Sequence, residues 1–221
     1  LLLAVYPSHR RSIAWPELSE WIHRHMCFGL RVLPNGFLSE SYLRIDILML
    51  SIFVSDHMIG IYSFAALFVE GLYQIPVVVR TIANPILVRL VKLRKNRLHL
   101  VRFCRRMMLV SSALFIIVAG IVLVAFPLLN PFFPVQLIES SYPVLIILVM
   151  GLLVYSAFIP LDSIFIQAGM PGRQSIFMTW NVSINGLLNL ILIPDFGIIG
   201  AAWATALSFI LSSLTLSIAT R

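Results

Sequence analysis

The sequence is poor in charged residues. Asp, Glu, Lys and Arg together make up 11% of its 221 residues, whereas apolar residues make up 60%. Soluble globular domains contain about 25% charged residues and about 45–50% apolar ones. The mean hydropathy is +0.98. This composition excludes an ordinary soluble domain and predicts an all-α integral membrane protein, because the apolar residues come in runs long enough for membrane-spanning helices.

Cysteine and acidic residues are also scarce. The two cysteines, Cys27 and Cys104, lack the even spacing of a secreted disulfide scaffold, so we expect free thiols. The 9 acidic residues are outnumbered by 16 basic ones. A nucleic-acid partner would need a soluble basic face with base-reading side chains, but these basic residues lie between apolar runs. We therefore predict that they orient the protein in a membrane.

Patterns of catalytic and metal-binding residues are missing as well. The sequence has no Ser/His/Asp, Cys/His or paired-carboxylate constellation, so it predicts neither an enzyme nor a cofactor. The stretch "HRHMC" (23–27) offers two histidines and a cysteine. Neighbouring donors on a helix point in different directions, and no distant cluster completes a four-ligand shell, so we predict no metal site.

What the sequence does contain is a series of apolar segments, each close to the length of about 20 residues that crosses a bilayer. The stretches "SDHMIG" (55–60) and "PDFG" (194–197) are tight turns, which predicts two helical hairpins. Residues 26–221 should therefore form one six-helix transmembrane bundle, and residues 1–25 the end of a preceding span and a cytoplasmic loop. The predicted spans are 30–54, 59–79, 107–129, 142–161, 175–194 and 198–219.

Residues 80–106 form the longest connector and carry nine Lys/Arg and no acid. Their apolar residues recur at near-helical spacing, which predicts an interfacial helix on anionic lipid. Cytoplasmic loops hold the excess of Lys and Arg, so this connector and the C-terminus should be cytoplasmic. The opposite turns carry Asp56, Glu139 and Asp195 and no basic residue. The residues that we assign to the membrane surface are Lys92, Arg94, Lys95, Arg97, Arg105 and Arg106.

Three charged residues, Glu40, Arg44 and Asp46, lie inside the first predicted span. An intramembrane charge costs from about 2.5 to over 10 kcal/mol, so such residues usually face a partner or a cavity. On one helix Glu40 and Arg44 would share a face, while Asp46 would point about 160° away from Arg44. One interpretation is structural, with a Glu40–Arg44 pair and Asp46 bonded to a neighbouring helix. The other is a functional site.

The second predicted span contains Glu70, with Gln74 one turn further along. Arg44 and Glu70 are equally distant in sequence from the turn at 55–60, which puts both about 20 Å from it. A direct ion pair between them is one expectation. The alternative is that Arg44 faces a hydrated cavity as an anion site whose availability Glu70 controls.

Asn181, Asn185 and Asn189 form a stripe of amides along the fifth predicted span. They suit hydrogen bonds between helices, or the wall of a polar cavity that takes sugar hydroxyls, and the sequence favours neither. In the sixth span, Gly200, Ala204 and Ser208 recur every four residues. This spacing of small residues predicts close packing of helices.

The motifs "IDILML", "GIYSFA", "AGMP" and "LIPDFGIIGAAWAT" together resemble the C-terminal half of bacterial polysaccharide flippases of the Wzx type. These flippases belong to the multidrug/oligosaccharidyl-lipid/polysaccharide exporter superfamily. The resemblance implies one bundle of a 12–14-helix flippase whose N-terminal bundle is a further partner. It also implies a substrate, an undecaprenyl-diphosphate-linked oligosaccharide that crosses the bacterial inner membrane by alternating access for polysaccharide or O-antigen biosynthesis. Arg44 is the position that best fits a diphosphate-binding arginine.

Other functions and partners stay open at this stage. A multidrug exporter of the same superfamily would use Asp46 or Glu70 as a proton- or sodium-coupled site, and a membrane fragment with a structural role would carry no cargo. Membrane lipids, polysaccharide polymerases and glycosyltransferases are further partners that the resemblance implies. The candidate substrate-binding residues are Glu40, Arg44, Asp46, Glu70, Gln74, Asn181, Asn185 and Asn189.

Overall fold

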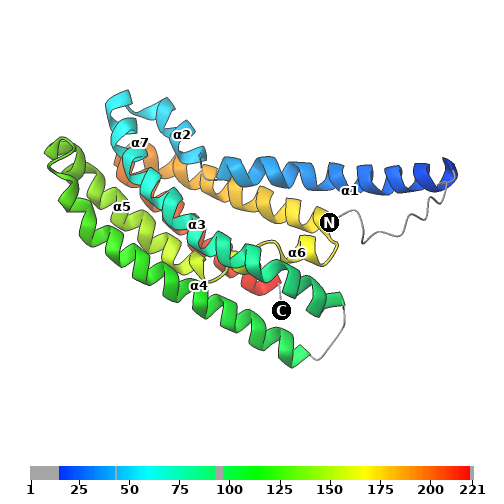
Figure 1. Ribbon diagram of the computed structural model, residues 1–221. Helices are drawn as coiled ribbons and strands as arrows, with labels where there is room; N and C mark the ends of the chain where they lie inside the picture. The colour runs from blue at the N-terminus through cyan, green and yellow to red at the C-terminus, as the bar shows by residue number, and fades with distance from the viewer. Residues whose placement is uncertain (1–14, 43, 93–96, 220–221) are drawn as a thin grey trace, which may run out of the picture.

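The computed structural model describes residues 15–42, 44–92 and 97–219, and in these ranges it contains helices and no strand (Figure 1). The expected all-α fold is confirmed. The α-helices are α1 (Trp15–Tyr42), α2 (Ile45–Phe53), α3 (Asp56–Lys92), α4 (Arg97–Ala125), α5 (Val135–Ser156), α6 (Ile164–Gln167) and α7 (Pro171–Ala219). Two short 3₁₀ helices, η2 (Phe126–Leu129) and η3 (Ile159–Leu161), follow α4 and α5.

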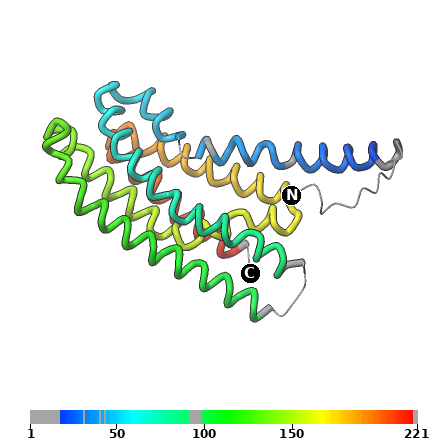
Figure 2. Tube along the Cα trace, viewed as in Figure 1, coloured from blue at the N-terminus to red at the C-terminus, as the bar shows by residue number. Residues whose placement is uncertain are grey.

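Four of the described helices are long and apolar enough to cross a membrane. They are α3, α4, α5 and α7, and α7 has a candidate span of 48 residues, about twice the usual length. Gly197 explains this length, because its backbone (φ 54°, ψ −132°) is not helical and α7 folds back there. Figure 2 shows one limb of α7 in yellow and orange and the returning limb in red. The predicted hairpin of spans five and six is confirmed.

The first predicted span, 30–54, is wrong as a continuous helix. The structure divides it into α1 and α2, and the backbone of Arg44 between them (φ −124°, ψ −6°) is not helical. The break places Asp46 in the first turn of α2, where the partial positive charge of a helix N-terminus favours a carboxylate. Helix α1 also begins much earlier than predicted and extends beyond the rest of the bundle (Figure 1).

The separate interfacial helix predicted for residues 80–106 is also wrong. Residues 80–92 continue α3 and residues 97–106 begin α4, while 93–96 lie outside the described residues. The helical spacing of the apolar residues does correspond to helix, but the helical residues belong to α3 and α4 rather than to a separate interfacial helix. Ala83 and Leu87 are buried against the bundle rather than turned towards a lipid surface.

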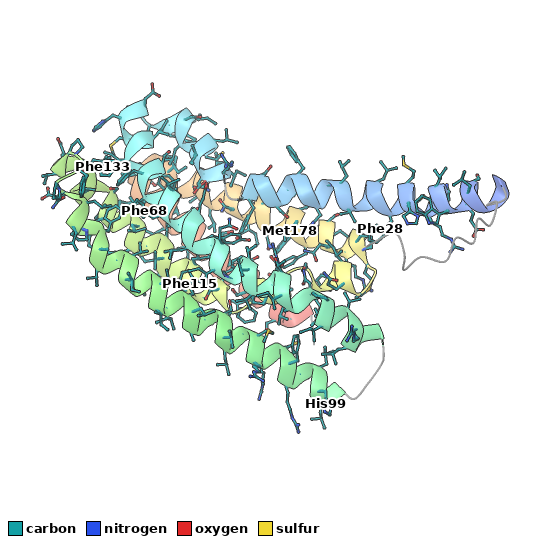
Figure 3. All side chains as sticks on the ribbon, viewed as in Figure 1. Phe28, Phe68, His99, Phe115, Phe133 and Met178 are labelled. Carbon is teal, nitrogen blue, oxygen red and sulfur yellow. The ribbon has the colours of Figure 1, made fainter. Side chains whose placement is uncertain are left out.

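The hydrophobic core lies around α5, which contacts α3, α4 and α7. It packs tightly against the second limb of α7, where a Cβ atom added to Gly151 would lie 2.4 Å from the Cα atom of Ala206. Phe115 of α4 is fully buried in this core (Figure 3). Many apolar side chains on the outer face of α4 are exposed, as expected for a surface in contact with lipid.

The connections collect at two opposite ends of the bundle (Figure 1). The α2–α3 and α4–α5 junctions and the bend of α7 lie at one end, and the end of α3, the start of α4 and the α6–α7 junction lie at the other. The loop charges predict the same grouping, with the turns that carry Asp56, Glu139 and Asp195 on the side opposite the basic residues of 80–106. Which end is cytoplasmic stays a prediction.

Candidate functional site

Two cavities with polar side chains in their lining adjoin each other among the described helices, and Tyr42 and Tyr73 line both of them. The larger has a volume of about 330 Å³ and a mostly polar lining. The smaller has a volume of about 20 Å³, enough for about one water molecule. The larger cavity is lined by Asn35, Ser39, Tyr42, Tyr73, Arg80, Thr81, Asn84, Tyr155, Asp162, Ser163, Gln174 and Met178. The smaller is lined by Tyr42, Asp46, Ala66, Val69, Glu70, Tyr73, Leu148, Thr205 and Phe209.

An ion pair between Arg80 and Asp162 forms one wall of the larger cavity. The Nη1 atom of Arg80, on α3, donates to Oδ1 and Oδ2 of Asp162 at 2.9 and 2.8 Å. Asp162 follows η3, and its side chain is 2% exposed, compared with 26% for Arg80. A carboxylate at this depth requires a charged partner. Because the two charges offset each other, the pair adds no net charge to the cavity.

Amide side chains surround this pair. Nε2 of Gln174, near the start of α7, donates to the backbone oxygen of Asp162 at 2.7 Å. Two amide oxygens at the cavity, Oε1 of Gln174 and Oδ1 of Asn35, are buried and have no hydrogen-bond partner among the described residues. Buried acceptors are nearly always satisfied by protein or water, so these two oxygens are places where a donor from a bound molecule would be favourable. Met178, on the same limb of α7, also lines the cavity (Figure 3).

Asp46 is the centre of a second polar cluster, beside the smaller cavity. Its carboxylate is 5% exposed and accepts a short hydrogen bond from the hydroxyl of Tyr62 on α3. It also accepts from Oγ1 of Thr205 on α7 at 3.4 Å and from the backbone N–H of Ile47 at 3.0 Å. The contacts with Tyr62 and Thr205 agree with the structural interpretation, in which Asp46 bonds to neighbouring helices. Glu70 is half-buried and lines the same small cavity.

A hydroxyl cluster joins α1 to the second limb of α7 next to Asp46. The hydroxyl of Tyr42 lies 3.1 Å from the hydroxyl oxygens of both Ser208 and Ser212. The small residues of this limb therefore do more than allow close packing, because two of the serines also bond to α1.

The predicted pairing of Glu40 with Arg44 does not have the geometry that the sequence suggested. The two residues do not lie on one helix, since Glu40 belongs to α1 and Arg44 precedes α2. Arg44 is exposed, and the side chain of Glu40 lies outside the described residues. The ion pairs among the described side chains are Arg24–Glu20 and Arg80–Asp162, so the expected direct pair of Arg44 with Glu70 is not found there.

The asparagine stripe is buried, with side chains 1%, 0% and 0% exposed at Asn181, Asn185 and Asn189. Nδ2 of Asn189 donates to the backbone oxygen of Asn185 at 3.0 Å and also to its side-chain oxygen. These bonds lie within α7 rather than between helices. None of the three residues lines either cavity. Both amide atoms of Asn181 have no partner among the described residues.

The remaining predicted residues lie at the surface or outside the described side chains. Gln74 is exposed and lines neither cavity, and Arg105 and Arg106 are exposed on α4. Lys92 and Arg97 lie at the ends of α3 and α4, where only their helical backbone is described, and Arg94 and Lys95 lie outside the described residues. In the described part of the chain, no group of three or more His, Cys, Asp or Glu side chains could hold a metal ion.

The Arg80–Asp162 pair is not among the residues predicted from the sequence, which places Arg80 in a surface connector. The signal was available on one side, because Asp162 is the only acidic residue between Glu139 and Asp195 and lies in an apolar stretch. The partner was not visible, since 82 positions separate the two residues in the chain.

No family model matches the sequence, and no curated protein matches it. Two solved structures are similar in fold. One is an outward-facing multidrug resistance MATE family transporter of the MOP superfamily, with 18% identity, a TM-score of 0.71, and coverage of 86% of this chain and 43% of that one. The other is a MOP superfamily transporter from Pyrococcus furiosus, with 17% identity, a TM-score of 0.73, and coverage of 86% and 42%.

The chain thus spans less than half the length of either transporter. At these identities the likeness establishes the fold. The chain has the all-α fold of one half of a MOP superfamily transporter, as the sequence predicted.

Proposed function

We propose that the chain is one half of a membrane transporter and that its cargo is a lipid-linked oligosaccharide of the undecaprenyl-diphosphate type. The observation that carries this proposal is the polar cavity of about 330 Å³ inside a bundle with the fold of half a transporter. Polar and ionisable groups inside a membrane bundle are costly and commonly mark a substrate path. A polar space of this size suits the headgroup of a lipid, while the polyprenyl tail stays in the bilayer.

The diphosphate is assigned to Arg44. This arginine is exposed at the break between α1 and α2, and it takes part in neither ion pair of the described side chains. Substrate sites of transporters typically lie where membrane helices are interrupted. A guanidinium binds two phosphate oxygens at once, which makes arginine well suited to a diphosphate.

The transport mechanism is alternating access, in which this bundle rocks against a second bundle around a shared site. The N-terminal half of the same transporter is the proposed partner. We place the protein in the bacterial inner membrane with the basic end of the bundle in the cytoplasm, because cytoplasmic loops carry the excess of Lys and Arg. Polysaccharide polymerases and glycosyltransferases would then act before and after the transport step.

A second candidate function is a cation-coupled multidrug exporter, which the Asp46 cluster favours. Asp46 is a buried carboxylate with hydroxyl neighbours, and Glu70 lines the same small cavity. Intramembrane acids of this kind occur in proton relays and ion pathways. One of the two structures similar in fold is described as a multidrug resistance transporter.

Binding measurements on the purified chain in nanodiscs separate these functions. The probes are a fluorescent polyprenyl-diphosphate-linked saccharide and the lipophilic cation tetraphenylphosphonium. We expect the saccharide lipid to bind, and Arg44→Ala to weaken it about tenfold or more, as for loss of a charge-assisted hydrogen bond. Arg105→Ala, which removes another exposed arginine, on α4, is the matched control and should leave binding unchanged.

Three results would contradict the proposal. Binding of the cation alone, with loss on Asp46→Asn, would favour the multidrug exporter. Binding of neither probe would favour a structural fragment. Equal weakening by Arg44→Ala and Arg105→Ala would reduce the role of Arg44 to general surface charge.

A further inference from the structure

We propose that the cavity of about 330 Å³ binds a neutral, hydroxyl-rich sugar unit and excludes the diphosphate. This inference deepens the proposed function and rests on it for the identity of the transported molecule. It assigns the sugar and the diphosphate of one substrate to different places, because Arg80, the arginine that lines this cavity among the described side chains, already has its charge offset by Asp162.

The charge balance of the cavity argues against a phosphate. Among the described side chains that line it, the charged ones are Arg80 and Asp162, which are joined by two hydrogen bonds from one guanidinium nitrogen. A phosphate that took Arg80 would leave the Asp162 carboxylate, 2% exposed, without its charged partner. A phosphate that did not displace it would lie beside a fixed negative charge. Both arrangements are unfavourable, whereas a neutral group meets neither cost.

The unsatisfied groups of the cavity are hydrogen-bond acceptors. Oε1 of Gln174 and Oδ1 of Asn35 are buried without a partner among the described residues, and Gln174 as a whole is 1% exposed. The other end of the Gln174 amide is fixed by its bond to the backbone oxygen of Asp162, so Oε1 cannot exchange roles with Nε2 without losing that bond. Phosphate oxygens accept hydrogen bonds and cannot donate to these groups, but sugar hydroxyls donate.

Aromatic side chains complete the lining. Tyr42, Tyr73 and Tyr155 contribute to the cavity from α1, α3 and α5. A tyrosine ring offers an apolar face, which suits contact with the C–H face of a sugar. The volume is at the lower end of the roughly 300–1,000 Å³ of small-molecule pockets, as expected for a short part of a glycan rather than a long chain.

The test uses the purified chain in nanodiscs, because many detergents carry sugar headgroups. The probes are free methyl glycosides of glucose, galactose and N-acetylglucosamine, observed by saturation-transfer NMR, and inorganic pyrophosphate, observed by ³¹P NMR. We expect at least one glycoside to bind with a millimolar Kd and pyrophosphate not to compete with it. The variants Gln174→Leu and Asn35→Leu should each raise this Kd about three- to tenfold, the usual effect of one lost hydrogen bond.

Gln136→Leu is the matched control, since Gln136 is exposed on α5 and lines neither cavity. Asn35→Leu guards against misfolding, because it removes an amide oxygen without a partner, whereas Gln174→Leu also removes a bond to the backbone. Binding of no glycoside would mean that water alone satisfies the two acceptors and would overturn the inference. Competition by pyrophosphate, or glycoside binding that neither variant weakens, would also overturn it.

The intact lipid-linked saccharide distinguishes this failure from failure of the proposed function. If that lipid binds but the free glycosides do not depend on Gln174 or Asn35, the transporter proposal stands and the cavity assignment fails. If the glycosides depend on both residues but the lipid does not bind, the cavity assignment stands and the proposed cargo fails.

Discussion

Removing Arg80 should destabilise the bundle, and removing Asp162 together with it should restore most of the lost stability. In Arg80→Met the methionine fills the apolar part of the space, while the Asp162 carboxylate, 2% exposed, loses its charged partner. Stranding one charge of a buried ion pair typically costs about 3–5 kcal/mol. The Arg80 side chain is 26% exposed and borders a polar cavity of about 330 Å³, so water reaches this site and the lower end of that range, about 3 kcal/mol, is expected.

The double variant Arg80→Met/Asp162→Leu replaces both charges with apolar groups. Such replacements of buried pairs are often neutral or stabilising, so its free energy of unfolding should return to within about 1 kcal/mol of the wild type. The measurement is unfolding by SDS in mixed micelles, followed by circular dichroism. Arg106→Met is the control for loss of an exposed arginine and should change stability by less than about 0.5 kcal/mol.

Two results would refute this reasoning. If Arg80→Met costs less than about 1 kcal/mol, the carboxylate is not held by the guanidinium, and water or a proton satisfies it instead. If the double variant is as unstable as Arg80→Met, the loss comes from packing around Arg80 rather than from the stranded charge. The same double variant also tests the cavity, because it removes the fixed charges while Gln174 and Asn35 remain.

Three further predictions address the charge, the topology and the packing of the chain. In the complete transporter, Arg44→Ala should abolish glycan export at normal protein level. Arg44→Lys should restore part of the export, because lysine keeps the charge but loses the two-pronged geometry of arginine. Full export by Arg44→Ala would contradict the assignment of the diphosphate to Arg44. A cysteine at Asp195 should react with an impermeant maleimide in intact cells, and one at Arg173 only after permeabilisation, whereas the reverse pattern would invert the orientation. Gly151→Ala should destabilise the bundle, because its Cβ would lie 2.4 Å from the backbone of α7. The control Gly120→Ala, whose Cβ would have nothing within 4 Å, should be neutral or slightly stabilising. Equal effects of the two variants on unfolding by SDS would contradict the packing of α5 against α7.

The sequence predicted those parts of the fold that depend on local pattern. Apolar runs, tight turns and the glycine at position 197 are local signals. The hairpin predicted at 194–197 is present, and the turn predicted at 55–60 joins the short helix α2, rather than a full span, to α3. The loop charges predicted which connections share an end of the bundle, and the structure has that arrangement. The apolar periodicity of residues 80–106 predicted helix, but it did not show that α3 and α4 extend into the basic stretch, because periodicity alone does not say where a helix ends.

The break between α1 and α2 depends on contacts that the sequence does not show. The residues on both sides of Arg44 favour helix, so local preference predicts a continuous span. Asp46 instead bonds to Tyr62, 16 positions away, and to Thr205, 159 positions away. These tertiary contacts become available once Asp46 lies in the first turn of a new helix. The Arg80–Asp162 pair was missed for the same reason, since its partners meet only when α3 packs against η3.

Arg44 and Arg80 differ in how strongly each can hold a cargo. A cargo has to bind strongly enough to enter a site and weakly enough to leave it again. Arg80 is held by Asp162, so its cavity offers only hydrogen bonds and aromatic contacts, which are individually weak. Arg44 is exposed and outside the described ion pairs, so in the proposed mechanism it supplies the strong contact to the diphosphate. In the proposed mechanism the cavity therefore holds the sugar part of the headgroup weakly, and Arg44 holds the diphosphate more strongly.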